Sequence, residues 1–231
     1  MERYAIIHEK FPREFVLLQG TGCRWSKCSF CDYHTDVSEN PYVVNKKVLS
    51  QVTGQYGVLD VINSGSGIEL DKDTIALINQ VVKEKKIHTL WFEMHYMYRN
   101  HLERFAQQFA PTKVKFRCGI ETFDADLRNK WNKGVSSEVT AEDVARYFQG
   151  VCLLCGTVGE LRNRILNDIQ LAKQYFDKMP HVDQFPTHTL WHDYKFQPFN
   201  QQLFDELTAD AFFPTGPSAP TPSLARISIR A

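Results

Sequence analysis

The sequence lacks the features that mark exported, membrane-embedded or nucleic-acid-binding chains. Lys and Arg together number 27, as do Asp and Glu, so no excess of positive charge attracts nucleic acid or acidic lipid. No apolar run approaches the length that spans a bilayer, and the first residues show no basic start followed by an apolar signal core. We therefore expect a cytoplasmic protein that has neither nucleic acid nor a membrane as its partner.

Six cysteines are present, and three of them, Cys23, Cys28 and Cys31, fall within nine residues directly after the apolar run 15–20. Without a secretory signal, cysteines are expected as metal ligands or free thiols rather than disulfides. Three thiolates on one loop can bind three irons of a [4Fe–4S] cube and leave the fourth iron open. With His34 as a fourth ligand, the same loop could instead hold a structural zinc ion, so the sequence leaves both metals open.

Short apolar segments alternate with helical patterns along most of the chain. Strands are expected at 4–8, 13–20, 58–63, 88–93, 114–120, 150–156 and 184–192. Helices are expected at 45–56, 71–85, 98–109, 124–131, from Thr140 onward and at 160–177. This alternation indicates βαβ units and parallel strands, as in a partial (β/α)6 TIM-like barrel or, alternatively, a doubly wound open sheet.

Length and composition set the domain organisation. A chain of 231 residues can bury one full core, so we expect a single α/β domain over residues 1–213. Residues 214–231 contain four prolines and no acidic residue, and show no apolar period, which predicts a disordered tail. Cys118, Cys152 and Cys155 are expected to be buried structural thiols, because positions three apart on a strand face opposite sides.

The predicted strand ends carry the polar residues of interest, since the site of a parallel βα barrel is built at the carboxyl ends of its strands. The Ser/Gly loop at 63–67 lets the backbone approach a ligand closely, although such loops are often plain turns. Glu93 and His95 lie among aromatic residues, where a carboxylate would suit the donor edge of a guanine-like base. A core strand with satisfied side chains remains the alternative there. Arg117 and Glu121 share one strand face and could equally form an ordinary ion pair.

Taken together, these motifs resemble the radical S-adenosylmethionine (SAM) superfamily, and within it most closely the queuine lyases. The superfamily features are the three-cysteine loop after a strand, Phe30 before its last cysteine, Gly-Ile-Glu-Thr at 119–122 and Gly-x-x-Gly-Glu at 156–160. Four residues separate the first two cysteines, whereas most members have three. Similarity to queuine lyases lies in Cys-Asp-Tyr-His-Thr-Asp, Trp-Phe-Glu-x-His-Tyr and Arg-Cys-Gly-Ile-Glu-Thr-Phe, and it covers roughly residues 10–178.

The resemblance implies a set of site residues. The [4Fe–4S] cluster would be held by Cys23, Cys28 and Cys31. SAM would be bound by Phe30, Ser64, Gly65, Ser66, Arg117 and Glu121. The substrate would be bound by Asn63, Glu93, His95 and Tyr98.

The resemblance also implies a reaction. A reduced cluster with SAM would generate a 5′-deoxyadenosyl radical that takes hydrogen from queuine, a 7-deazaguanine base. Cleavage would give 7-aminomethyl-7-deazaguanine and a cyclopentene-derived product, with the electron coming from a donor such as flavodoxin or ferredoxin. Another radical SAM reaction on a small molecule, or a non-catalytic zinc-binding domain, are the alternatives that the sequence leaves open.

Overall fold

The computed structural model describes residues 3–8, 11–155, 161–176, 187–191 and 229–230. The chain divides into two compact units. The first comprises residues 1–26, 31–118 and 147–149, and the second comprises residues 27–30, 119–146 and 150–231. Within the ranges given above, no helix is long and apolar enough to cross a membrane.

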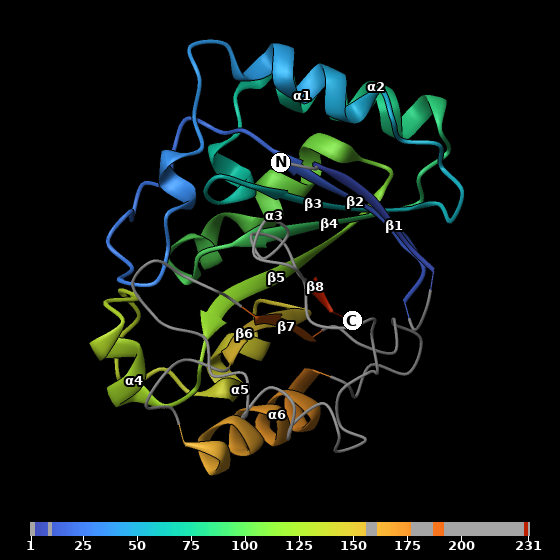
Figure 1. The fold of residues 1–231 in the computed structure, drawn as a ribbon. Coiled ribbons are helices and arrows are strands. Elements are labelled where there is room, and N and C mark those ends of the chain that lie inside the picture. The colour runs from blue at the N-terminus through green and yellow to red at the C-terminus, as the bar shows by residue number, and fades with distance from the viewer. Residues whose placement is uncertain (1–2, 9–10, 156–160, 177–186, 192–228, 231) are drawn as a thin grey trace. The chain divides into compact units, whose positions relative to one another are not determined.

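The first unit is organised around a sheet that begins with β1 (Tyr4–Ile7) and β2 (Arg13–Leu18), which pair antiparallel (Figure 1). β3 (Val58–Asn63), β4 (Thr89–Met94) and β5 (Lys113–Glu121), which belongs to this unit as far as Cys118, follow in that order, each parallel to the strand before it. β2 and β3 are buried along their whole length. Continuous burial is typical of parallel strands that are covered on both faces.

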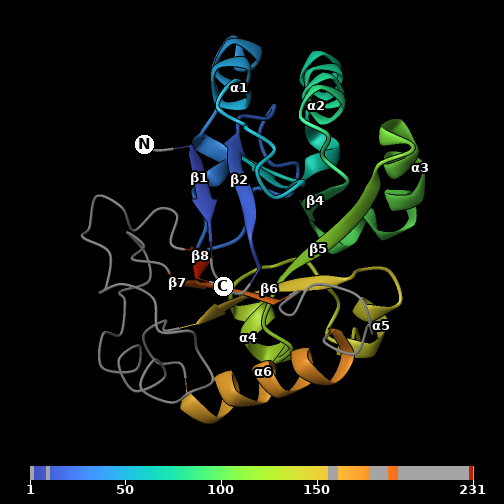
Figure 2. The same cartoon turned by 90° about the vertical axis from the view of Figure 1, so that its right-hand side faces the viewer.

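The α-helices in the described residues of the first unit are α1 (Pro41–Leu49), α2 (Lys72–Glu84) and α3 (Leu102–Ala106). α1 and α2 pack side by side, and α1 also contacts β2 (Figure 2). α2 begins after Asp71 as predicted, because the Asp71 carboxylate accepts the Thr74 backbone N–H at 2.8 Å. α3 covers β4, where the rings of Phe105 and Phe92 meet edge to face with centroids 5.1 Å apart.

Two helices of the first unit differ from their predicted ranges. The helix expected at 45–56 begins earlier, because Asn40 caps it and Pro41 takes its first position. It ends at Leu49. The helix expected at 98–109 is reduced to α3, with 3₁₀ turns at Tyr96–His101 and Gln107–Phe109 on either side. The chain cannot continue as a helix toward Pro111.

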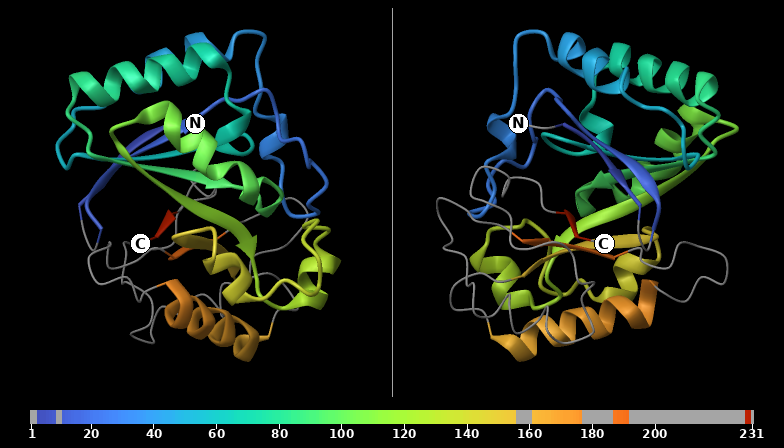
Figure 3. Two further views of the ribbon diagram at one scale, coloured as in Figure 1. Left: turned by 180° about the vertical axis from the view of Figure 1, so that it is seen from behind. Right: turned by 45° about the vertical axis from the view of Figure 1, so that its right-hand side comes forward.

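The second unit contains β6 (Gly150–Cys155) and β7 (Thr187–Trp191), which are parallel, and β8 (Ile229–Arg230), which is antiparallel to β7. Its helices are α4 (Ala125–Lys130), α5 (Ala141–Ala145) and α6 (Arg162–Phe176), the last packing on β6 (Figure 3). α5 follows Thr140, where a helix was expected to begin, and a capping box between Thr140 and Asp143 starts it. β8 falls in the predicted tail; the rest of that tail and the motif at 156–160 lie outside the described residues.

Candidate functional site

The cysteine loop, residues 20–36, is anchored at its start from two directions. Asn45 of α1 holds Gln19 by both backbone groups: its Oδ1 accepts the N–H at 2.7 Å and its Nδ2 donates to the carbonyl at 2.8 Å. The hydroxyl of Ser64, after β3, accepts the Gly20 N–H at 2.7 Å. The first unit therefore fixes the direction in which the loop leaves β2.

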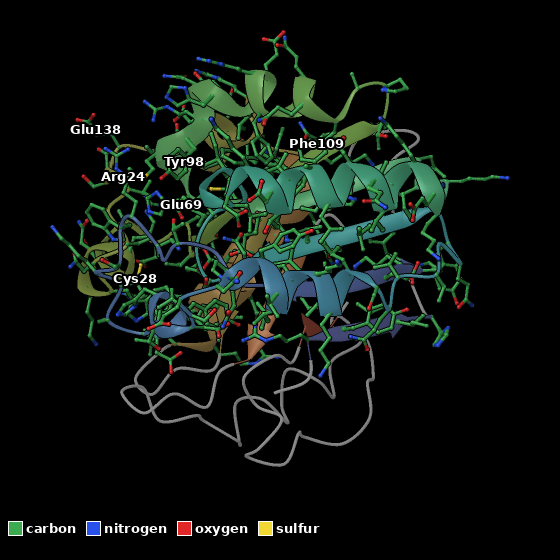
Figure 4. The ribbon with its side chains drawn as sticks, turned by 90° about the horizontal axis from the view of Figure 1, so that it is seen from above. Arg24, Cys28, Glu69, Tyr98, Phe109 and Glu138 are labelled. Atoms are coloured by element: carbon green, nitrogen blue, oxygen red, sulfur yellow. The ribbon has the colours of Figure 1, made fainter. Side chains whose placement is uncertain are left out.

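Glu69 holds the next part of this loop, although the sequence analysis did not single it out. Its Oε1 accepts the backbone N–H of Arg24 at 2.9 Å and the hydroxyl of Tyr98 at 2.6 Å. Its Oε2 accepts the backbone N–H of Ser66 at 2.6 Å. Figure 4 shows Arg24, Glu69 and Tyr98 gathered at one place. The Ser-x-x-Glu spacing of a capping box, Ser66 to Glu69, was the sequence signal that could have identified it.

A cavity of about 630 Å³ lies beside this carboxylate. Its lining includes Cys23, Arg24 and His34 from the cysteine loop, together with Glu69 and Tyr98. All of these residues belong to the first unit. The volume falls within the range of small-molecule sites.

Gly65 lies where the Ser/Gly loop after β3 meets the cysteine loop. A Cβ atom on Gly65 would stand 3.1 Å from the Cys23 Cα and 3.2 Å from the Gly22 carbonyl oxygen, and would collide with the Glu69 carboxylate. Only glycine allows two backbones to approach this closely. Gly65 therefore has a packing role next to Cys23, and its role toward SAM stays a prediction.

Three of the four residues predicted to bind substrate come together at the ends of β3 and β4, at Asn63, His95 and Tyr98. The His95 N–H donates to the Ser66 hydroxyl at 2.9 Å, and the Asn63 Nδ2 donates to the Ser66 carbonyl at 3.2 Å. Asn63 is only 2% exposed, and its Oδ1 has no hydrogen-bond partner within the described part of the chain. A buried acceptor of this kind calls for a donor, which a ligand can supply.

The ring of His95 has a defined hydrogen-bonding state. Its Nδ1 accepts the backbone N–H of Met97 at 3.1 Å, which in the neutral ring leaves the proton on Nε2. Trp25 of the cysteine loop stacks on the same ring, with centroids 5.8 Å apart. His95 thus offers an N–H donor at the edge of the loop that carries the cysteines.

Glu93, the fourth residue predicted to bind substrate, lies opposite Arg117 in the register of β4 and β5. Arg117 is buried and donates to both carboxylate oxygens of Asp60, at 2.7 and 3.2 Å, while Arg13 donates to Asp60 at 2.9 Å. Burial alone would raise the pKa of Asp60, but the two guanidinium groups outweigh it and lower that pKa. Arg117 therefore has a structural partner that the sequence did not reveal, and its role toward SAM remains a prediction.

Phe30 and Glu121, both predicted to bind SAM, are brought together in the second unit by Lys133. The Lys133 ammonium donates to Glu121 Oε1 at 2.8 Å and lies 5.5 Å from the centre of the Phe30 ring. Glu121 is 4% exposed and has a φ of 69°, and among the described residues its Oε2 has no hydrogen-bond partner. A strained backbone and a spare buried acceptor are typical of ligand-binding positions.

The turn at residues 131–134, after α4, holds the middle of the cysteine loop, whose residues 27–30 belong to the second unit. The Asn132 side chain donates to the Lys27 carbonyl at 3.0 Å, and the Ser29 N–H donates to the Trp131 carbonyl at 3.0 Å. The segment that flanks Cys28 is thus positioned by the turn after α4.

The chemistry of the cysteine loop fits an iron–sulfur cluster. Cys23, Cys28 and Cys31 form no disulfide and are partly exposed. The Cys23 Sγ accepts the Ser26 N–H at 3.4 Å, and hydrogen bonds of this kind tune cluster potentials. In the described ranges, no three Cys, His, Asp or Glu side chains are arranged to hold a single metal ion. A cube differs from such a site because each thiolate binds a different iron.

The other cysteines were predicted to be buried structural thiols. Cys118 and Cys152 are indeed buried. The side chain of Cys155 lies outside the described residues, so that part of the prediction is untested.

The fold and the site can be set beside known proteins. A scan against protein-family models finds no match, and neither does a search of curated protein sequences. Among solved structures, the chain is similar to queuine lyase from Clostridium spiroforme bound to SAM and queuine, with 35% identity and a TM-score of 0.76. The match covers 91% of this chain and 90% of that one, which confirms the predicted α/β partial TIM-like barrel with mostly parallel strands. On this evidence the protein is an enzyme of the lyase type and belongs to the queuine lyase family of radical SAM enzymes.

Proposed function

We propose that the protein cleaves queuine to 7-aminomethyl-7-deazaguanine and a cyclopentene-derived product, with a [4Fe–4S] cluster and SAM as cofactors. The observation that supports this most is the 35% identity, over 91% of the chain, to a queuine lyase that was solved with SAM and queuine. The cavity beside Cys23, with ring and carboxylate groups in its lining, is consistent with a small-molecule substrate.

The cluster and SAM, when bound, supply a 5′-deoxyadenosyl radical that removes hydrogen from the substrate. Cys23, Cys28 and Cys31 would hold three irons through their thiolates. A cytoplasmic flavodoxin or ferredoxin would deliver the electron. The protein's own task is to orient the substrate and to keep water and stray hydrogen donors away from it.

The residues at the ends of β3 and β4 have the hydrogen-bonding groups that a guanine-like edge requires. That edge presents a ring N–H and an exocyclic amine as donors, and a carbonyl oxygen as acceptor. Glu93 would accept from the donors, while the Nε2–H of His95 would donate to the carbonyl oxygen. The free Oδ1 of Asn63 would accept a further N–H, and Tyr98 would offer its hydroxyl oxygen as an acceptor.

The residues proposed to bind SAM differ in whether their side chains already have hydrogen-bond partners within the protein. The hydroxyls of Ser64 and Ser66 already accept the backbone N–H groups of Gly20 and His95, so we expect their backbone, rather than their side chains, to contact SAM. The spare Oε2 of Glu121 would accept from SAM directly. Phe30 would pack against SAM through its ring.

Anaerobic reconstitution tests this function. We expect an EPR signal of a reduced [4Fe–4S] cluster that changes when SAM is added, and conversion of queuine to 7-aminomethyl-7-deazaguanine with release of 5′-deoxyadenosine. Cys28→Ala should abolish the signal and the product. Release of 5′-deoxyadenosine without consumption of queuine would contradict the proposal that queuine is the substrate. Stoichiometric zinc in place of a cluster would contradict the proposal of radical SAM chemistry.

A further inference from the structure

We propose that Glu69 is a positioning residue that fixes the cysteine loop, at Cys23, against the end of β4. The carboxylate connects three separate segments: the cysteine loop, the Ser/Gly loop after β3 and the 3₁₀ turn after β4. The expected effect on turnover of queuine rests on the proposed function. The expected effect on the position of Cys23 is independent of it.

The partners of Glu69 match the hydrogen-bonding capacity of a carboxylate. All three partners of the Glu69 side chain are donors: the N–H groups of Arg24 and Ser66 and the hydroxyl of Tyr98. An ionised carboxylate only accepts, and its two oxygens have room for all three donors. An amide would turn an NH₂ group toward at least one of them, so no neutral side chain of the same shape replaces Glu69.

Glu69 also contacts the cysteine loop on both sides of Cys23. Its side chain accepts from Arg24, one residue after Cys23, at 2.9 Å. Its carbonyl accepts the hydroxyl of Thr21, two residues before Cys23, at 3.3 Å. A displacement of Glu69 therefore reaches Cys23 directly through the neighbouring Arg24, and through one intervening residue, Gly22, from Thr21.

The cysteine loop and the Ser/Gly loop are in close contact beside Glu69. A Cβ atom on Gly65 would stand 3.1 Å from the Cys23 Cα, and it would also collide with the Glu69 carboxylate. The loops are thus packed backbone to backbone at this point, and loss of the hydrogen bonds cannot be absorbed by a softer contact. Glu69 lines the same cavity as Cys23 and Tyr98, so the change would be felt where the ligands bind.

Glu69→Gln tests the inference, with Glu138→Gln as the matched control because Glu138 is an exposed residue of the second unit. The first measurement uses the apoprotein without metal: the rate at which iodoacetamide alkylates Cys23 under anaerobic conditions, followed by peptide mass spectrometry. We expect alkylation about tenfold faster in Glu69→Gln, since hydrogen bonds to a charged acceptor are lost, and no change in Glu138→Gln. The buried thiols of Cys118 and Cys152 serve as internal references.

The outcomes separate the inference from the proposed function. An unchanged rate at Cys23 in Glu69→Gln would overturn the inference, whatever the substrate is. Faster alkylation of Cys118 and Cys152 as well would also overturn it, because it would show general unfolding instead of local release. Inactivity of the wild-type protein toward queuine would overturn only the proposed function.

A second measurement uses the reconstituted enzyme. In Glu69→Gln the ratio of 5′-deoxyadenosine released to queuine consumed should rise about threefold, because a displaced cysteine loop misaligns the radical and the substrate. The EPR change produced by SAM should also be smaller in Glu69→Gln than in Glu138→Gln. An unchanged ratio together with an unchanged EPR response would contradict a positioning role.

Discussion

Two glutamates of the first unit, Glu14 and Glu69, have the same kind of partners in different surroundings. Glu14 accepts the hydroxyl of Tyr4 at 2.7 Å and the N–H groups of Thr53 and Gly54, each at 2.7 Å. Glu69 likewise accepts one tyrosine hydroxyl and two backbone N–H groups. Glu14 is fully buried at the start of β2. Glu69 follows the end of β3 and lines the cavity beside Cys23.

The comparison teaches that hydrogen-bonding chemistry alone does not distinguish a structural group from a functional one. In both cases burial, followed by the nearby carboxylate, raises the pKa of the tyrosine, Tyr4 or Tyr98, so the hydroxyl stays protonated. The distinction comes from position: the carboxyl ends of parallel strands form the site of a βα barrel, and the amino ends form its stable base. We therefore expect Glu14 to govern stability and Glu69 to govern the cysteine loop.

Glu14→Ala gives the largest expected effect. It removes a fully buried carboxylate and with it three hydrogen bonds to a charged acceptor, from the part-buried donors of Tyr4, Thr53 and Gly54, so the free energy of unfolding should fall by about 3 kcal/mol. Glu69→Ala, at a partly exposed position, should lose about 1 kcal/mol but accelerate alkylation of Cys23. Urea denaturation of the apoprotein measures the first quantity. Equal losses of stability, with equal alkylation of Cys23, would contradict the distinction between the two glutamates.

A third carboxylate, Asp168 of α6, extends the comparison to the second unit. It accepts the hydroxyl of Thr122 at 2.6 Å and the N–H of Phe123 at 2.9 Å. Burial raises the pKa of Asp168 from 3.8 to about 6, whereas the donors around Glu14 outweigh burial and lower the pKa of that carboxyl. Two donors are therefore too few to stabilise the buried charge of Asp168.

The sign of the pH dependence follows from this difference. Between about pH 4 and pH 6 the folded protein holds a proton on Asp168 that the unfolded chain has released, so the free energy of unfolding falls as pH rises through this window. In Asp168→Asn this decline should be about 2 kcal/mol smaller than in the wild type. The measurement is the free energy of unfolding of each protein, from urea denaturation at pH 4 and at pH 7. Parallel pH profiles of wild type and variant would show that Asp168 does not titrate there.

Gly54, which contacts Glu14, and Gly65, which contacts Glu69, provide a further comparison, with an expected effect of similar size to that of Asp168→Asn. Gly54 has a φ of 83°, and a Cβ there would collide with the Lys85 carbonyl oxygen. Gly54→Ala should therefore cost about 2 kcal/mol of stability through strain and leave Cys23 unaffected. Gly65→Ala should instead displace the cysteine loop, lowering the iron bound per protein after reconstitution while Gly54→Ala binds as much iron as the wild type. Normal iron content in Gly65→Ala would contradict the close packing at Cys23.

Local patterns in the sequence predicted the elements, and the structure shows why they could not predict the partners. β3 has the predicted bounds, and helices begin at Asp71 and Thr140 as expected, because each of these residues caps its helix through a contact within four residues. The earlier start of α1 also had a local signal, since asparagine followed by proline is a common helix start. A three-cysteine loop was equally local, and so were the residues that carried the family resemblance.

The pairing of polar groups across the fold had no local signal. Arg117 was assigned to SAM from its strand face alone, but its carboxylate partner, Asp60, lies 57 residues earlier. Glu69 meets Tyr98 across 29 residues and Arg24 across 45. These contacts depend on how neighbouring strands end, which is set by the packing of the sheet, and a single sequence does not contain that information.

Removal of the single tyrosine hydroxyl that donates to each glutamate gives the smallest expected effect. Tyr4→Phe and Tyr98→Phe each delete one O–H donor, to Glu14 and to Glu69, and leave the ring and the other hydrogen bonds in place. Each should cost about 1 kcal/mol or less in the free energy of unfolding, the cost at Tyr98 being smaller because Glu69 can exchange the lost donor for water. Tyr98→Phe should raise the KM for queuine without changing Cys23 alkylation, since the Arg24 and Ser66 bonds to Glu69 remain, whereas Tyr4→Phe should leave the KM unchanged. An increase in Cys23 alkylation in Tyr98→Phe would show that the hydroxyl, and not the backbone bond to Arg24, is what fixes the cysteine loop.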